Sequence, residues 1–125
     1  MIKFKTKKDE SVFYKCHPML VMMVCDFALF WHESKKDMTI TATLSTLEED
    51  QKLERVSSSH REGRAVDIRI NDVPKEFVNE WYIWANRKYG KIGAFNKSGG
   101  QSLIVLHGTG DNYHAHVQLN KNFCV

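Results

Sequence analysis

Residues 58–67 read Ser-Ser-His-Arg-Glu-Gly-Arg-Ala-Val-Asp, and a second short motif, His-Ala-His, stands at residues 114–116. Each motif alone is a weak signal. Together they supply two kinds of group, imidazole and carboxylate, which are the ligand types of a zinc site that keeps one position for water. The two motifs therefore predict a metal site and the pair of strands that carries it.

Side chains alternate between the two faces of a strand, and both predicted strands separate apolar from polar residues. In residues 65–70, Val66, Ile68 and Ile70 share the apolar face, and Asp67 and Arg69 share the polar face. In residues 113–119, the apolar face carries Ala115, Val117 and Leu119, and the polar face carries His114, His116 and Gln118. If the strands are neighbours, Asp67 and His116 meet across the sheet. Gly63 can adopt conformations closed to other residues, which would turn His60 toward the same ion.

Each candidate ligand also has an ordinary explanation. A lone Asp in a strand is usually solvated or paired with an Arg such as Arg64 or Arg69, and a lone His on a polar strand face is usually exposed. Two imidazoles on one strand face are more typical of a metal site. The joint pattern of His60, Asp67 and His116 favours zinc over chance placement.

The chain has 125 residues and a formal net charge of +3, with Lys and Arg spread along it. This length predicts one domain, residues 1–125, and we expect a monomer. The mild basic bias would help attraction to an anionic polymer. No basic stripe alternates with exposed aromatic residues, so we expect no nucleic-acid partner.

Three cysteines, Cys16, Cys25 and Cys124, form no metal-binding or disulfide pattern. Free thiols indicate folding in a reducing cytoplasm. The apolar run 19–25 is interrupted by Asp26 and has no cleavage site after it, so we expect neither a signal peptide nor a membrane span.

The rest of the chain predicts an α+β fold in which helices cover one face of a small, mostly antiparallel sheet. Apolar periodicity and capping residues predict helices at 18–33, 46–55 and 74–89, the last ending at Gly90. Alternation predicts strands at 1–5, 38–44, 65–70, 102–106 and 113–119. Residues 7–11 are expected to be a polar connection, and residues 93–100 a loop.

The pattern Ser58-x-His60-x-x-Gly63-x-Ala65-x-Asp67 resembles the signature of the M15 family of zinc peptidases, and residues 114–118 resemble its C-terminal motif. That family includes D-alanyl-D-alanine carboxypeptidases and L-alanyl-D-glutamate endopeptidases, among them phage endolysins. A comparable constellation marks lysostaphin-type peptidases and the hedgehog signalling domain. The resemblance implies a hedgehog/DD-peptidase-like fold, with zinc bound by His60, Asp67 and His116.

The chain departs from that family at two positions. Tyr113 replaces the Glu or Asp that serves as general base in many members, so the resemblance makes His114 the catalytic residue, with Asp111 and His107 as alternatives. Ser45 stands near the place of an Arg that holds the substrate. The residues that could compensate are Arg55, Arg61 and Arg64.

By this resemblance the protein is a peptidase that hydrolyses an amide bond in peptidoglycan peptides, with Ser58, Arg64 and Tyr113 contacting the substrate. Free thiols and the lack of an export signal suit a phage endolysin, which waits in the host cytoplasm and acts on the cell wall after release. The second hypothesis is a zinc-stabilised binding module whose catalysis is impaired.

Overall fold

The computed structural model describes residues 2–124, apart from the side chains of residues 123 and 124. Its helices are α1 (Lys7–Val12), α2 (Pro18–Glu33), α3 (Leu47–Lys52) and α4 (Lys75–Tyr89), with 3-10 turns at Phe13–Lys15, Gly90–Ile92, Gly110–Asn112 and Lys121–Cys124. Its strands are β1 (Ile2–Phe4), β2 (Met38–Ala42), β3 (Ala65–Arg69), β4 (Ala94–Phe95), β5 (Gln101–Ser102), β6 (Ile104–His107) and β7 (His114–Gln118).

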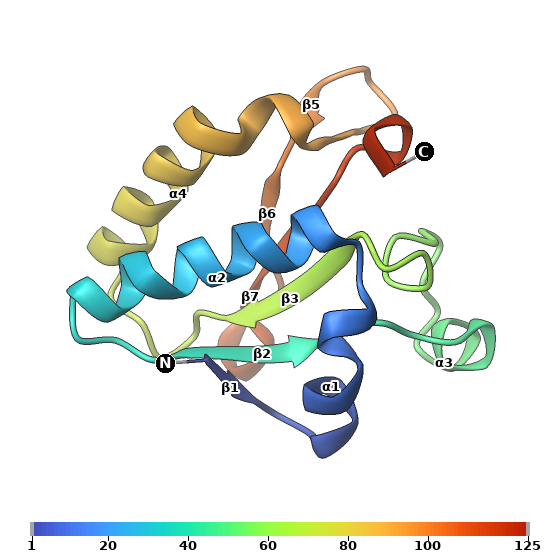
Figure 1. Ribbon diagram of the computed structural model, residues 1–125, viewed down its shortest axis with the longest axis horizontal. Coiled ribbons are helices and arrows are strands. Elements are labelled where there is room, and N and C mark those ends of the chain that lie inside the picture. The colour runs from blue at the N-terminus through green and yellow to red at the C-terminus, as the bar shows by residue number, and fades with distance from the viewer. Residues whose placement is uncertain (1, 125) are drawn as a thin grey trace.

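Five strands form one sheet in the order β1-β2-β3-β7-β6 (Figure 1). Only the β1–β2 pair is parallel, and the other neighbours are antiparallel. The predicted α+β class with a mostly antiparallel sheet is confirmed. In the centre of the sheet, Asp67 lies opposite His116 and Arg69 lies opposite His114.

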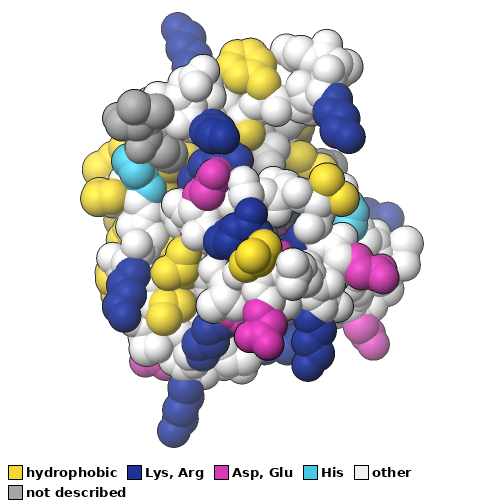
Figure 2. All heavy atoms as spheres, turned by 90° about the vertical axis from the view of Figure 1, so that its right-hand side faces the viewer, with side chains coloured by type: hydrophobic (Ala, Val, Ile, Leu, Met, Phe, Trp, Pro, Cys, Tyr) yellow, Lys and Arg dark blue, Asp and Glu magenta, His cyan; other side chains and the backbone are white. Residues whose placement is uncertain are grey.

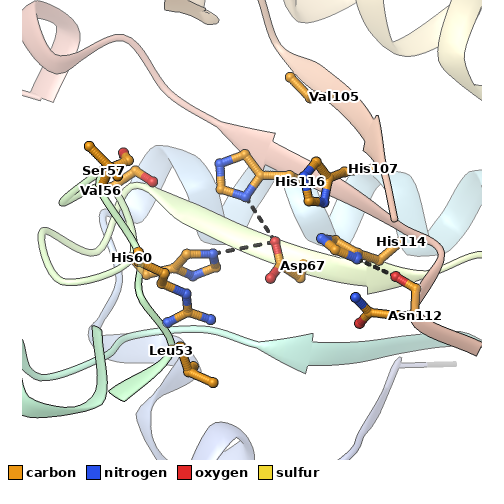
Figure 3. Close-up of a pocket in the computed structure, with 12 residues that line it drawn as sticks. Leu53, Val56, Ser57, His60, Asp67, Val105, His107, Asn112, His114 and His116 are labelled. Atoms are coloured by element: carbon orange, nitrogen blue, oxygen red, sulfur yellow. Dashed lines mark hydrogen bonds and ion pairs between the residues drawn. The ribbon is translucent and has the colours of Figure 1, made fainter. Parts of the chain in front are cut away.

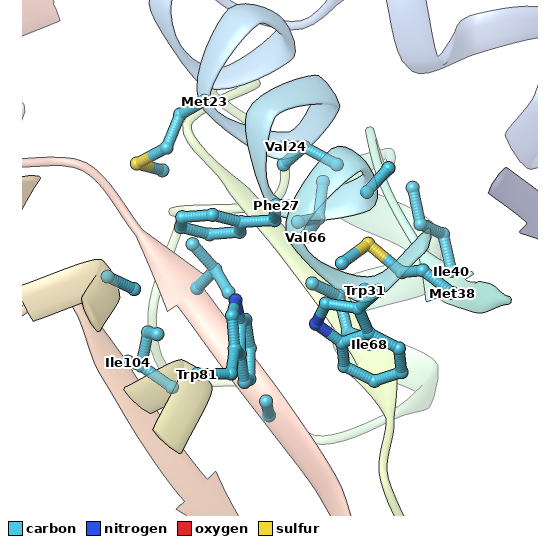
Figure 4. Packing of buried hydrophobic residues seen from close by; sticks show 14 of the residues in the cluster. Met23, Val24, Phe27, Trp31, Met38, Ile40, Val66, Ile68, Trp81 and Ile104 are labelled. Carbon is cyan, nitrogen blue, oxygen red and sulfur yellow. The ribbon is translucent and has the colours of Figure 1, made fainter. Parts of the chain in front are cut away.

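Helices α2 and α4 pack on one face of this sheet and enclose the core (Figures 1 and 4). Pro18 lies in the first turn of α2, where a missing N–H costs little. The ring of Phe27 meets Trp81 of α4 edge-on, with centroids 5.4 Å apart. Burial of Val66 and Ile68 beneath α2 leaves Asp67 on the opposite face, as alternation along β3 predicts.

Two of the sequence predictions were wrong. Residues 7–12 form helix α1 rather than a connection, because Thr6 caps it and buried Asp9 accepts hydrogen bonds from the Thr43 amide (3.1 Å) and hydroxyl (2.7 Å). The expected loop at 93–100 contains β4, which pairs with β5 in a separate hairpin. Both depend on contacts that the local pattern does not reveal.

The chain between α3 and β3 makes a tight irregular turn that ends at Gly63. This glycine has a φ of 70°, and an added Cβ would lie 3.3 Å from the Cα of Cys16. Within the turn, the Gly63 amide donates a hydrogen bond to the His60 carbonyl at 3.1 Å. The predicted role of Gly63 in redirecting the backbone is confirmed.

The described residues include the side chains of two of the three cysteines and all helices named above. Cys16 and Cys25 are free thiols, whereas the side chain of Cys124 lies outside the described residues. Within residues 2–124, no helix has both the length and the apolar character needed to span a bilayer.

Candidate metal centre

Three side chains from separate segments converge on one point of the polar sheet face (Figure 3). His116 Nδ1 lies 2.8 Å from Asp67 Oδ1, and His60 Nε2 lies 3.3 Å from the same oxygen. The three candidate ligand atoms all lie within 4.8 Å of one another. The predicted convergence of His60, Asp67 and His116 is confirmed.

The outer nitrogen of each imidazole has its own acceptor. His60 Nδ1 lies 2.8 Å from the Thr43 carbonyl, and His116 Nε2 lies 3.1 Å from Gln118 Oε1. Because the outer nitrogens donate to these acceptors, each inner nitrogen can either donate a second proton to Asp67 or, without that proton, offer its lone pair to a metal ion. Such outer partners fix the ring orientation and tautomer of metal-binding histidines. Nothing in the sequence pointed to Thr43, because its carbonyl carries no side-chain signal.

Asp67 supplies a buried negative charge to the cluster. Its exposed fraction is 8 %. Burial alone would raise the pKa of this carboxyl, but the hydrogen bonds and charges of His116 and His60 outweigh burial and lower the pKa below its usual range. An ionised buried carboxylate requires a paired cation or a metal. Two imidazoles and one carboxylate therefore form a donor set that could hold a divalent metal ion.

The cluster forms one wall of a pocket of about 430 Å³. Residues from the loop after α3 border it on one side, and residues of β6 and β7 border it on the other (Figure 3). Its apolar lining comes from Leu53, Val56 and Val105. Ser59 also lines it and was not predicted as a site residue; its buried hydroxyl has no hydrogen-bond partner among the described residues. The pocket thus offers a partly apolar surface beside a polar centre.

His114 lies in the same pocket but outside the ligand cluster. Its Nδ1 lies 2.7 Å from the Asn112 carbonyl, so a proton there leaves Nε2 with a lone pair. The ring of His107 on β6 is its neighbour, with centroids 5.2 Å apart. Asp111, the other alternative base, lines an adjoining pocket instead. Among the described residues, His114 and His107 are therefore the histidines that line the main pocket outside the ligand cluster.

Arg55, Arg61 and Arg64, which could replace the family's substrate-holding arginine, differ in their position relative to the pocket. Arg55 lines the main pocket, and its Nη1 lies 3.2 Å from the buried carboxylate of Asp50. Arg61 binds the other oxygen of Asp50 at 2.9 Å, while Ser45 donates to Asp50 at 2.6 Å. Burial would raise the pKa of Asp50, but these partners lower it. Asp50 thereby holds the segment that carries Arg55.

Of the three residues predicted to contact the substrate, only Tyr113 lines a pocket beside the ligand cluster. Arg64 donates to the Glu62 carboxylate at 2.7 Å and to the Leu119 carbonyl at 2.9 Å, and it does not line either pocket beside the cluster. The Ser58 carbonyl accepts a hydrogen bond from the Glu62 amide at 2.9 Å, and Ser58 is also absent from both linings. Tyr113 is half-buried and lines the adjoining pocket.

Comparison with known proteins adds no relative: no protein-family model, no curated protein and no solved structure matches this chain. What the site can do is therefore judged from its own geometry.

Proposed function

We propose that this protein is a zinc-dependent peptidase with a hedgehog/DD-peptidase-like fold that hydrolyses amide bonds in peptidoglycan peptides. The observation that carries the proposal is the cluster of His60, Asp67 and His116, whose inner nitrogens and carboxylate lie within 4.8 Å of one another in an open pocket. Two imidazoles and one carboxylate are the ligands of catalytic zinc sites that leave a fourth position for water. Zinc held there would lower the pKa of a bound water and polarise the substrate carbonyl.

His114 is the proposed acid–base residue. The Asn112 carbonyl holds its Nδ1 proton, so Nε2 can accept a proton from the attacking water. The same nitrogen can then return the proton to the leaving amine, which is the exchange that general acid–base catalysis requires. Within the described residues, the only carboxylate that lines the main pocket is Asp67, and Asp67 belongs to the ligand cluster.

Arg55 is the proposed electrostatic residue for the tetrahedral intermediate. It is the arginine of the main pocket, and the buried carboxylate of Asp50 holds its guanidinium. A positive charge fixed before the reaction stabilises the negative oxygen that develops as the carbonyl is attacked. Arg55 would thus take the part that an arginine near Ser45 plays in many M15 peptidases.

The surface charge suits a small enzyme that finds an anionic wall by diffusion. Figure 2 shows Lys and Arg side chains scattered over one face and interspersed with Asp and Glu, rather than gathered in one patch. A net charge of +3 favours weak, general attraction to such a polymer. We propose a monomeric, endolysin-like enzyme that resides in the host cytoplasm and acts on the wall after release, with no nucleic-acid or membrane partner.

A second candidate is a zinc-stabilised binding module without turnover. The observation that favours it is the Tyr113 side chain, which stands where many M15 peptidases carry their acidic base. In that case the ligand cluster would keep its metal, and the pocket would bind a wall peptide without cutting it.

Digestion of purified peptidoglycan separates the two functions. The wild-type protein with zinc should release peptide fragments that mass spectrometry identifies, and a chelator should stop the release until zinc is restored. His114→Ala should lose roughly 100-fold or more of the rate, whereas the control His32→Ala, on the exposed end of α2, should keep it. Binding without any released fragment would replace the peptidase with the binding module.

A further inference from the structure

The ring of His60 is buried, and the chain segment 43–45 sets its orientation. His60 Nδ1 lies 2.8 Å from the Thr43 carbonyl. Because a carbonyl oxygen can only accept, this hydrogen bond requires a proton on Nδ1. The Ser45 amide donates to the His60 carbonyl at 3.4 Å. The segment therefore holds both the ring and the backbone of this candidate ligand, and it leaves Nε2 as the nitrogen that faces Asp67.

The pairing of β2 with β3 does not fix Thr43 itself. The register of these two strands is irregular between Ile40 and Ala42, and its last pair is Ala42 with Asp67. Thr43 lies one residue beyond that pair and is buried. The direction of its carbonyl must therefore come from contacts outside the sheet.

Asp9 of α1 supplies those contacts, because α1 lies beside the carboxyl end of β2 (Figure 1). One carboxylate oxygen of Asp9 accepts two hydrogen bonds from Thr43, from the amide at 3.1 Å and from the hydroxyl at 2.7 Å. The other oxygen accepts from the Thr6 hydroxyl at 2.7 Å, and this hydroxyl accepts from the Asp9 amide at 3.1 Å. Asp9 is thus fixed by the cap of its own helix and fixes Thr43 in turn.

A carboxylate at position 9 carries a cost that an uncharged side chain would avoid. Asp9 is buried, and among the described residues no Lys, Arg or His forms an ion pair with it. Burial of a charge without a paired cation is unfavourable. In return, hydrogen bonds to an ionised acceptor are shorter and stronger than those between neutral groups. The gain from Asp9 is therefore a firm hold on Thr43, which lies 34 positions away in the sequence.

We propose that Asp9 is a positioning residue of the metal centre: it fixes Thr43, whose carbonyl fixes the tautomer and the orientation of His60. This inference rests on the proposed zinc site, to which a preset His60 Nε2 adds affinity. Acceptors that orient a metal-binding histidine contribute roughly 10- to 100-fold to metal affinity. Asp9 acts one hydrogen bond further from the ion, so its effect lies at the lower end of that range.

Zinc competition against a chromophoric chelator measures this effect, at a temperature where circular dichroism shows every variant folded. Asp9→Ala should weaken zinc binding about 10-fold. Asp9→Asn keeps one oxygen for the two Thr43 hydrogen bonds and should recover most of the affinity. The matched control is Asp26→Ala, because Asp26 also accepts from two side chains, Lys88 at 2.6 Å and Tyr89 at 2.5 Å, but lies on α2 across the sheet from the cluster. This control should bind zinc as tightly as the wild type.

The metal-free protein gives a second readout that needs neither zinc nor catalysis. Long-range nitrogen NMR shows which ring nitrogen of His60 carries the proton. The wild type, Asp9→Asn and Asp26→Ala should show a proton on Nδ1 that exchanges slowly with solvent. Asp9→Ala should show a mixture of tautomers or faster exchange of that proton.

Thr43→Val keeps the test decisive if Asp9→Ala does not fold. This change removes only the 2.7 Å hydrogen bond from the hydroxyl to Asp9. It should alter the His60 ring signal in the same direction and weaken zinc binding roughly 2- to 5-fold. Wild-type zinc affinity and an unchanged ring signal in the folded variants would overturn the positioning role, even if those variants are less stable. Zinc binding that depends on Asp9 without any peptide hydrolysis would support the positioning role and refute the peptidase.

Discussion

Replacement of Asp67 by Asn tests the metal centre most directly. Asn keeps the volume of the side chain and one carbonyl oxygen, but it removes the buried negative charge that lies 2.8 Å from His116 and 3.3 Å from His60. An ion that binds only the folded state stabilises it by about 2.7 kcal/mol when its free concentration is 100 times Kd. For a chain of 125 residues, this corresponds to a rise in Tm of about 10 °C, from the unfolding entropy per residue.

Scanning calorimetry with zinc and then with excess chelator measures this rise. The wild-type protein should gain about 10 °C with zinc and lose it with chelator, while Asp67→Asn should gain less than about 2 °C. If the Asn variant folds poorly, His116→Ala should independently lose the zinc-dependent rise in Tm. His32→Ala, on the exposed surface of α2, serves as the matched histidine control and should keep that rise. An unchanged Tm in wild type, or a full rise in Asp67→Asn, would refute the metal centre.

Three further outcomes follow from the fold. Phe27→Ala should cost about 3–5 kcal/mol in urea denaturation, because Phe27 is fully buried at the centre of the aromatic cluster. Burial raises the pKa of Cys16 to about 11, whereas Cys25 is only half-buried, so a thiol reagent at pH 8 should modify Cys25 before Cys16 in the folded protein. The partners of Asp50 lower its pKa below the ordinary 3.8 in the folded state, so on acidification the unfolded chain takes up this proton first. The contribution of Asp50 to the free energy of unfolding should therefore be fully present above about pH 4 and be lost in more acidic buffer. Urea denaturation at a series of pH values should show a smaller loss in Asp50→Asn.

Strand alternation was enough to predict the centre of the site. The separation of Val66 and Ile68 from Asp67 follows from a period of two, and the same period places His116 on the matching face of β7. Antiparallel neighbours then bring these two ligands opposite each other. This part of the site depends only on local geometry and one strand pairing.

Other parts of the site depend on contacts distant in the sequence. Arg55 lines the main pocket and Arg61 and Arg64 do not. Asp50 binds both Arg55 and Arg61, and Glu62 binds Arg64. No spacing rule reveals this placement. Helix α1 likewise depends on the bond between Asp9 and Thr43, 34 positions apart.

The pairing of β3 with β7 gives the protein a built-in check on assembly. A slip of β7 by one residue would turn His114 and His116 toward Trp81 and the rest of the core, and would expose Val117 to solvent. Such a chain would bury charged or unsatisfied imidazole rings and lose its apolar packing. It would therefore unfold and be degraded by quality-control proteases. Folded copies should consequently carry the assembled ligand cluster, and defects at this position should appear as a low yield of folded protein.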